Sequence, residues 1–190
     1  IQDLCNHHDA LLIVDEVQTG IARTGKMFGF EHFGVQPDII GLAKAMGGGF
    51  PIGAMVCRNK IAETMSYGDH GSTYGGNPLA CAASLAALNT VIDENLTEQA
   101  AEKGDFLKKK IKDLSTNVSE IVDIRGQGLM IGVELSVEGR PVVEQMMHQG
   151  ILSNCAQGNV MRLVPPLVVT EEDLSTLAEV LITAIKKSSP

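Results

Sequence analysis

Hydrophobic and polar positions divide the first half of the chain into short apolar runs separated by polar or glycine-rich segments. Three of these runs, at residues 11–14, 39–43 and 52–57, are short and rich in aliphatic residues, which predicts strands. The first run is apolar at every position and therefore predicts a parallel strand buried on both faces. Residues 1–8 and 60–65 predict two short helices.

Two longer helices are predicted at the centre of the chain. Asn77 followed by Pro78 predicts a helix start, because Asn is a favoured N-cap and Pro is favoured at the first helical position. Residues 79–92 are alanine-rich on nearly every face, so this helix is expected to be buried. A second, amphipathic helix is predicted across residues 95–114 by the spacing of Ala100, Gly104 and Leu107.

The pattern changes after residue 114. Strands are predicted at residues 118–124, 129–135 and 160–164, a short helix at residues 141–150, and a final helix whose start is capped by Thr170 and Asp173. We therefore expect two domains, with residues 1–113 in an α/β domain that has a mixed or parallel sheet and residues 114–190 in a small α+β domain.

Composition excludes several classes of function. The 190 residues carry a formal net charge of −8 without a compensating basic cluster, which argues against a nucleic-acid surface. The sequence has no run of about 18 apolar residues, so no membrane span is predicted. The four cysteines are widely scattered, and His7 and His8 are adjacent, so no metal site is predicted and a reducing, cytoplasmic compartment is expected.

Candidate chemistry lies where two of the predicted parallel strands end. Asp15 follows the first apolar run and Lys44 follows the second. Ligands of open α/β sheets bind beyond the carboxyl ends of the strands, so both side chains should project toward one crevice. Pyridoxal phosphate (PLP) requires a lysine for its Schiff base and an acid beside its pyridinium nitrogen. Residue type alone also permits a surface lysine and an aspartate that caps the next turn.

Three motifs in order extend this hypothesis to a family. They are VDEVQTG at residues 14–20, AK before GGGFP at residues 43–51, and HGSTYGGNPLA at residues 70–80. Together they resemble the class III (subgroup II) PLP-dependent aminotransferases, above all the acetylornithine and ornithine aminotransferases. The resemblance implies fold type I, with PLP as cofactor and a homodimer that shares its active sites. It covers nearly the whole chain but only the C-terminal half of the family's members, whose phosphate-binding glycine turn and stacking aromatic are expected before Ile1.

The resemblance also implies roles for individual residues. Lys44 would carry PLP and move the substrate's Cα proton, and Asp15 would pair with the pyridinium nitrogen. Gln18 matches the residue that donates a hydrogen bond to the phenolic oxygen of PLP. Thr73 matches the threonine that reaches the PLP phosphate of the other subunit, and Ser72 is a weaker phosphate-binding candidate.

Substrate recognition is expected from the second predicted domain. Arg162 lies in MRLVPPL, which resembles the segment whose arginine binds the substrate α-carboxylate through two parallel hydrogen bonds. Arg23 follows Gln18 in the same loop and receives no role, and Ala22 stands where the family more often has glycine.

The expected reaction moves an amino group between N-acetylornithine and 2-oxoglutarate. Alternatives are ornithine or 4-aminobutyrate as amino donor, or a non-catalytic role for this piece without the preceding half. A dinucleotide site at Gly126 and Gly128 is excluded, because Ile131 occupies the third glycine position of that motif.

Overall fold

The computed structural model describes residues 1–188 and divides the chain into two compact units, Ile1–Thr97 and Glu98–Pro190. The boundary therefore precedes most of helix α4 (Leu96–Leu114), whereas the sequence predicts a boundary after residue 113, at the end of that helix. The physical reason is the apolar face of α4. Its side chains Leu107 and Ile111 are fully buried in the hydrophobic core of the second unit.

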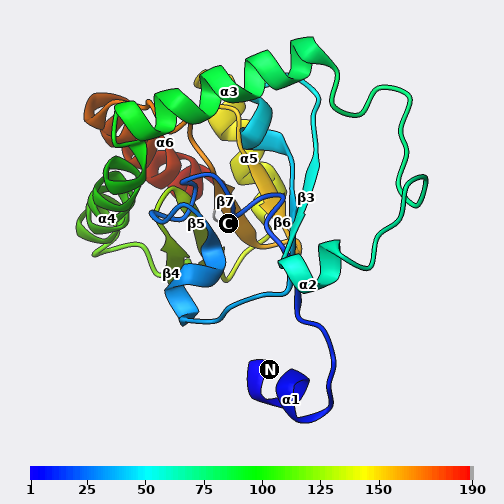
Figure 1. Cartoon of the computed structure of the whole chain (residues 1–190). Helices are drawn as coiled ribbons and strands as arrows, with labels where there is room; N and C mark the ends of the chain where they lie inside the picture. The colour runs from blue at the N-terminus through cyan, green and yellow to red at the C-terminus, as the bar shows by residue number, and fades with distance from the viewer. Residues whose placement is uncertain (189–190) are drawn as a thin grey trace. The chain divides into compact units, whose positions relative to one another are not determined.

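The first unit contains a three-stranded sheet in the order β1-β2-β3 (Figure 1). The strands are β1 (Ile13–Asp15), β2 (Ile39–Leu42) and β3 (Ala54–Cys57). β1 and β2 are parallel, and β3 is antiparallel to β2. The three predicted strands, the parallel pairing of the first two and the mixed sheet are thus confirmed.

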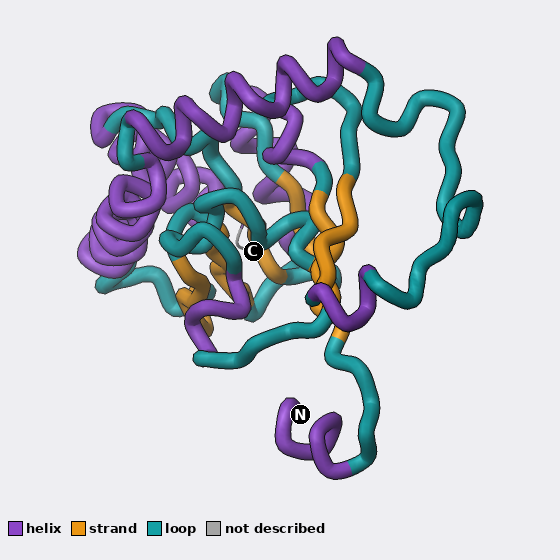
Figure 2. The backbone as a smooth tube through the Cα atoms, in the orientation of Figure 1, coloured by secondary structure: helices purple, strands orange, loops and turns teal. Residues whose placement is uncertain are grey.

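Short helices and one long helix complete the first unit. They are α1 (Gln2–His7), the 3-10 turns η1 (Gly29–Phe33) and η2 (Lys44–Gly47), α2 (Asn59–Ala62) and α3 (Pro78–Asp93). The predicted cap of α3 is confirmed, since Asn77 Oδ1 accepts a hydrogen bond of 2.9 Å from Ala80 N. α1 lies at the end of an extended segment, and a long loop joins α2 to α3 (Figure 2).

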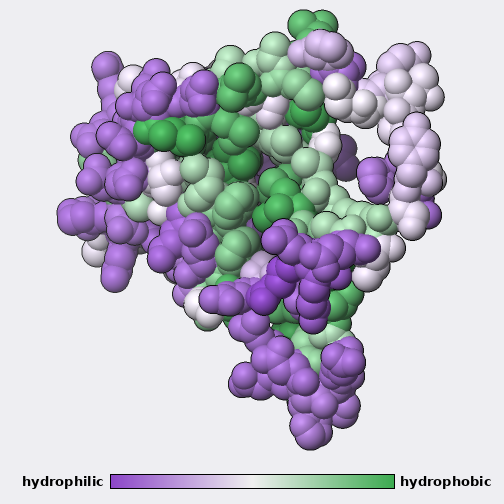
Figure 3. Space-filling model, viewed as in Figure 1, coloured by the Kyte–Doolittle hydropathy of each residue, from purple (hydrophilic) through white to green (hydrophobic). Residues whose placement is uncertain are grey.

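Burial of the first strand and of α3 differs from the expectation. Ile13 is 64% exposed and Val14, on the other face of β1, is only half-buried, so neither face of this strand is fully covered. α3 is not buried on every face, and its exposed apolar residues include Leu79 and Leu85. Apolar side chains are visible on the outer surface of α3 in Figure 3. The first unit therefore exposes apolar side chains on both β1 and α3.

The second unit is the predicted small α+β unit. Its antiparallel sheet has the order β4-β5-β7-β6. The remaining elements are β4 (Ile121–Gln127), β5 (Met130–Leu135), α5 (Gly139–His148), β6 (Asn154–Ala156), β7 (Val160–Leu163) and α6 (Glu171–Ser188). Side chains from the sheet form one apolar core with α4, α5 and α6. β6 is the one strand of this sheet without a sequence prediction.

The glycines of the RGQG segment form the β4–β5 hairpin. Gly126 has a φ of 130° and Gly128 a φ of 51°, both in the region that favours glycine. The backbone of Gly128 also lies where a Cβ on Gly104 of α4 would be, so the helix approaches the hairpin closely. These glycines thus serve backbone packing. Within residues 1–188, no helix has both the length and the apolar character needed to cross a bilayer.

The exposed apolar surface of the first unit predicts self-association of the 190-residue chain when it is prepared alone. Contiguous exposed apolar surface is characteristic of protein–protein contact sites. We expect sedimentation velocity at micromolar concentration to detect oligomers or aggregates. Leu85→Lys should reduce association because it places a charge on the apolar face of α3. Asn89→Lys, which adds the same charge at an exposed polar position one turn along, should reduce it less. A chain that stays monomeric would contradict this expectation.

Candidate functional site

Asp15 and Lys44 lie at the same edge of the first sheet. Asp15 is paired with Gly41 in the parallel register. The backbone pairing extends one residue further, where Glu16 N donates a hydrogen bond of 3.0 Å to Gly41 O. β1 and β2 therefore end side by side, and Lys44 follows at the start of η2. Both side chains are exposed. The structure thus brings the two candidate residues to the carboxyl edge of neighbouring parallel strands.

A sharp turn places Lys44 at the strand end. Its φ of 45° lies in the left-handed region, which costs a residue with a Cβ about 1 kcal/mol. The turn that follows is closed by a hydrogen bond of 3.1 Å from Met46 N to Ala43 O. Gly48 and Gly49 continue it with φ values of 59° and 106°. The backbone therefore leaves the direction of β2 at Lys44 itself.

Glu16, the residue after Asp15, is a buried carboxylate at the base of the site. It is 1% exposed. Its Oε2 accepts hydrogen bonds from Gly29 N at 2.9 Å and Thr19 Oγ1 at 2.5 Å, and its Oε1 accepts one from Phe30 N at 2.8 Å. A buried carboxylate requires such partners, because leaving it unpaired costs several kcal/mol. Glu16 therefore ties the loop after β1 to the start of η1.

Asp15 points away from that buried network, as expected for neighbouring residues on a strand. Its Oδ1 accepts a hydrogen bond of 2.9 Å from Val17 N. Gln18 is also exposed, at the turn that follows. Ala22 is fully buried with a φ of 66°, a conformation that glycine would adopt without strain. Arg23, beside it, is half-buried.

Ser72 and Thr73 lie in the loop between α2 and α3, which projects away from the sheet in Figure 1. Both residues are exposed. The loop has local hydrogen bonds, from Gly75 N to Ser72 O at 3.3 Å and from Asn77 Nδ2 to Tyr74 O at 2.9 Å. The first unit does not bring these two residues together with Asp15 and Lys44.

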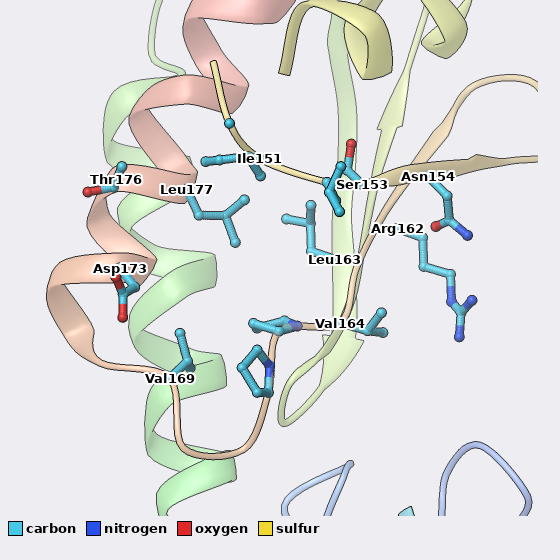
Figure 4. Close-up of a pocket in the computed structure, with 14 residues that line it drawn as sticks. Ile151, Ser153, Asn154, Arg162, Leu163, Val164, Val169, Asp173, Thr176 and Leu177 are labelled. Carbon is cyan, nitrogen blue, oxygen red and sulfur yellow. The ribbon is translucent and has the colours of Figure 1, made fainter. Parts of the chain in front are cut away.

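Arg162 lies in the second unit, on β7. Its neighbours Met161 and Leu163 are buried in the core, so Arg162 projects from the opposite face of the sheet. Figure 4 shows Arg162 and Asn154 pointing the same way, whereas Leu163 and Leu177 point into an open pocket. This pocket has a volume of about 590 Å³ and is lined mainly by apolar residues of the β6, β7 and α6 segments.

The family model for aminotransferase class-III matches residues 1–185. The chain belongs to the class III aminotransferase family.

Curated class III aminotransferases resemble the chain over nearly its whole length. It is 47% identical to acetylornithine aminotransferase of Methanocaldococcus jannaschii over 190 residues, a match that covers 98% of this chain and 48% of that protein. It is 42% identical to ornithine aminotransferase 1 of Staphylococcus saprophyticus over 188 residues, covering 98% of this chain and 47% of that protein. The chain thus spans about half the length of the curated relatives it matches.

Solved structures of the family share the fold. The crystal structure of acetylornithine aminotransferase from Elizabethkingia anophelis has a TM-score of 0.91 at 40% identity, covering 98% of this chain and 48% of the other. Ornithine aminotransferase from Plasmodium yoelii has a TM-score of 0.92 at 35% identity, covering 98% and 51%. The predicted class III family and the fold type I architecture are confirmed.

The sequence predicts a role for Asp15 but none for Glu16, the second acid of the VDEVQTG motif. The alternation of side chains along a strand already indicates that adjacent acids face opposite ways, so one of them needs buried partners. In residues 1–188, no group of three or more His, Cys, Asp or Glu side chains is arranged to hold a metal ion. The exposed candidate Asp15 is thus followed directly by a buried glutamate that fixes the backbone beside it.

Replacement of Glu16 should loosen the loop that this carboxylate holds. Glu16→Gln keeps one acceptor oxygen but replaces the other with an amide, which leaves a backbone N–H at Gly29 or Phe30 without its partner. The loss of such a bond costs about 1–3 kcal/mol. Hydrogen exchange of these two amides should therefore accelerate at least about tenfold.

The matched control is Glu31→Gln. Glu31 Oε2 accepts a hydrogen bond of 2.9 Å from Phe28 N at an exposed position. This change should leave exchange at Gly29 and Phe30 close to that of the unaltered chain. Equal exchange rates in the two variants would show that Glu16 does not hold the loop.

Proposed function

We propose that the full-length protein containing this chain transfers an amino group from N-acetylornithine to 2-oxoglutarate, with PLP as cofactor. The products are N-acetylglutamate semialdehyde and glutamate. The placement of Asp15 and Lys44 at one edge of two parallel strands carries the proposal. Relatives named acetylornithine aminotransferase, at 46–47% identity, support the choice of amino donor.

The residues at this edge have the donors and acceptors that PLP requires. One oxygen of Asp15 accepts the Val17 amide, so the second oxygen of this exposed carboxylate can accept a protonated ring nitrogen. Gln18 supplies an amide N–H for the phenolic oxygen. The exposed amine of Lys44 can carry the cofactor covalently.

Two residues of this edge act directly in the proposed reaction. Bound PLP supplies an electron sink for the pair left when the substrate's Cα–H bond breaks. The negative charge of Asp15 keeps the ring nitrogen protonated and so maintains that sink. The amine of Lys44, when it is not bonded to the cofactor, would accept the substrate's Cα proton and deliver it to the cofactor carbon bonded to the amino nitrogen, within the same half-reaction.

The remaining candidates bind charged groups. Arg162 has a planar fork that matches the α-carboxylate of the substrate. Ser72 and Thr73 present hydroxyls on an exposed loop before the N-terminus of α3, a setting that favours a phosphate. Because this loop projects away from its own sheet, we assign these hydroxyls to the cofactor phosphate of a second subunit. The proposed enzyme is therefore a homodimer, and we place it in the cytoplasm.

Ornithine or 4-aminobutyrate as amino donor is the alternative, and the 42% identity to an ornithine aminotransferase favours ornithine of the two. Measurement of kcat/KM for N-acetylornithine, ornithine and 4-aminobutyrate distinguishes them. A preference for ornithine or 4-aminobutyrate would overturn the assigned donor. The 190-residue chain alone is expected to have little or no activity, and borohydride reduction followed by peptide mass mapping tests whether it binds PLP covalently.

Replacement of Lys44 tests the covalent attachment. In the full-length protein, Lys44→Ala should bind PLP without a borohydride-reducible link and lose transaminase turnover, because only a primary amine can form that link. Lys26→Ala removes another exposed lysine and should retain both properties. Substantial turnover in the Lys44 variant would exclude this assignment.

Replacement of Asp15 tests the charge at the ring nitrogen. Asp15→Asn preserves shape but removes the charge, so we expect half-reaction rates to fall on the order of 100-fold while PLP affinity changes less. Stopped-flow absorbance in single-turnover mixing measures both half-reactions. Asp93→Asn, at the exposed end of α3, is the control and should react at the normal rate. Normal rates in the Asp15 variant would leave Asp15 with only its turn-capping role.

A further inference from the structure

Two buried residues of the loop between β1 and η1 have a backbone conformation that their side chains disfavour. Ile21 has a φ of 58° and Ala22 a φ of 66°. Both are buried, with exposed fractions of 3% and 0%. A β-branched residue in this left-handed region is an outlier, and such strain persists only where the surrounding structure holds it. The loop therefore needs contacts that keep these two residues in place.

Hydrogen bonds supply such contacts within the loop and from η1. Ala22 N donates to Met27 O at 3.2 Å, and Gly25 N donates to Ala22 O at 2.9 Å. These two bonds fix the shape of the loop. His32 of η1 joins it from outside, because its Nε2 lies 3.0 Å from Thr24 O and 3.1 Å from Thr24 Oγ1. The side chain of His32 thus attaches the loop to η1.

The geometry determines which nitrogen of His32 carries the proton. A backbone carbonyl can only accept a hydrogen bond, so Nε2 is the protonated nitrogen when the imidazole is neutral. Thr24 is buried and His32 is half-buried. Loss of the donor would leave a buried carbonyl without this partner, which destabilises the folded loop.

The loop continues directly from the turn that supports Asp15. Gly20 N closes this turn by donating to Glu16 O at 2.9 Å, and a Cβ on Gly20 would lie only 2.7 Å from the same oxygen. Within the turn, Val17 N donates to Asp15 Oδ1 at 2.9 Å. A rotation about the backbone of Ile21 would change the direction in which the chain leaves the turn. The conformation of Ile21 is therefore coupled to the support of Asp15.

We propose that His32 is a positioning residue of the cofactor site, because its hydrogen bond to Thr24 holds the strained loop and so keeps closed the turn that orients Asp15. This inference rests on the proposed function, in which Asp15 faces the ring nitrogen of PLP. Without the His32 bond, Ile21 and Ala22 can relax to negative φ values. Asp15 then loses part of its orientation, and a hydrogen bond of ordinary strength corresponds to about a fivefold weakening of PLP binding.

The test uses the full-length protein, with the Kd of PLP measured by titration of the apoenzyme and hydrogen exchange measured at the amides of Ala22 and Gly25. His32→Leu removes the N–H donor, so Kd and both exchange rates should rise about fivefold. His32→Gln can place an amide N–H near the position of Nε2 and should return these values toward those of the unaltered protein. His148→Leu, at an exposed position of α5, is the control and should change neither quantity.

A double variant tests whether His32 acts through Asp15. If it does, adding His32→Leu to Asp15→Asn should raise the Kd of PLP by less than about twofold, since the charge that the turn orients is already absent. A rise of about fivefold on both backgrounds would overturn the positioning role, because independent sites have additive effects.

Nitrogen NMR of the neutral imidazole tests the inference even where His32→Leu does not fold. Nε2 of His32 should be protonated, and a proton on Nδ1 instead would overturn the inference. Unchanged exchange in a folded His32→Leu variant would do the same. Faster exchange with an unchanged Kd would overturn only the positioning role and would leave the proposed function in place. Failure of the unaltered full-length protein to bind PLP would overturn the proposed function, and the role of His32 toward PLP with it.

Discussion

The buried carboxylate of Glu16 is the interaction on which the candidate cofactor edge depends. Its hydrogen bonds to Gly29 N and Phe30 N join the end of β1 to a segment 13 and 14 residues later in the chain. Alternation along the strand turns Asp15 outward as Glu16 turns inward. The inward acid therefore fixes the backbone from which the outward acid projects.

Local interactions were predictable from the sequence. The cap of α3 by Asn77 and the reciprocal hydrogen bonds between Thr170 and Asp173 at the start of α6 use side chains within three residues of their partners. The parallel pairing of β1 and β2 was predictable because both are short aliphatic runs. The roles of the motif residues were predicted from the resemblance to a family, because a lysine after a strand has no chemical specificity by itself.

Features that depend on long-range contacts were not predictable in the same way. The β6 strand has three residues and lacks the polar and apolar alternation of a half-buried strand, so it is defined by its pairing with β7. The left-handed φ of Lys44 follows from the turn that ends β2, although lysine has no preference for that conformation. The exposure of Ile13 likewise depends on whether another layer covers that face of β1, which a short apolar run does not reveal.

In the second unit, the core fixes the register that the polar face requires. Met161 and Leu163 are buried on either side of Arg162, and Ile131 and Val133 on either side of Gly132. A slip of one residue in either strand would turn these apolar side chains to the outer face, and the core would lose them. Burial on one face therefore determines which residues share a row on the other. The position of Arg162 is a consequence of core packing, so a core substitution that permits slippage would displace Arg162 without replacing it.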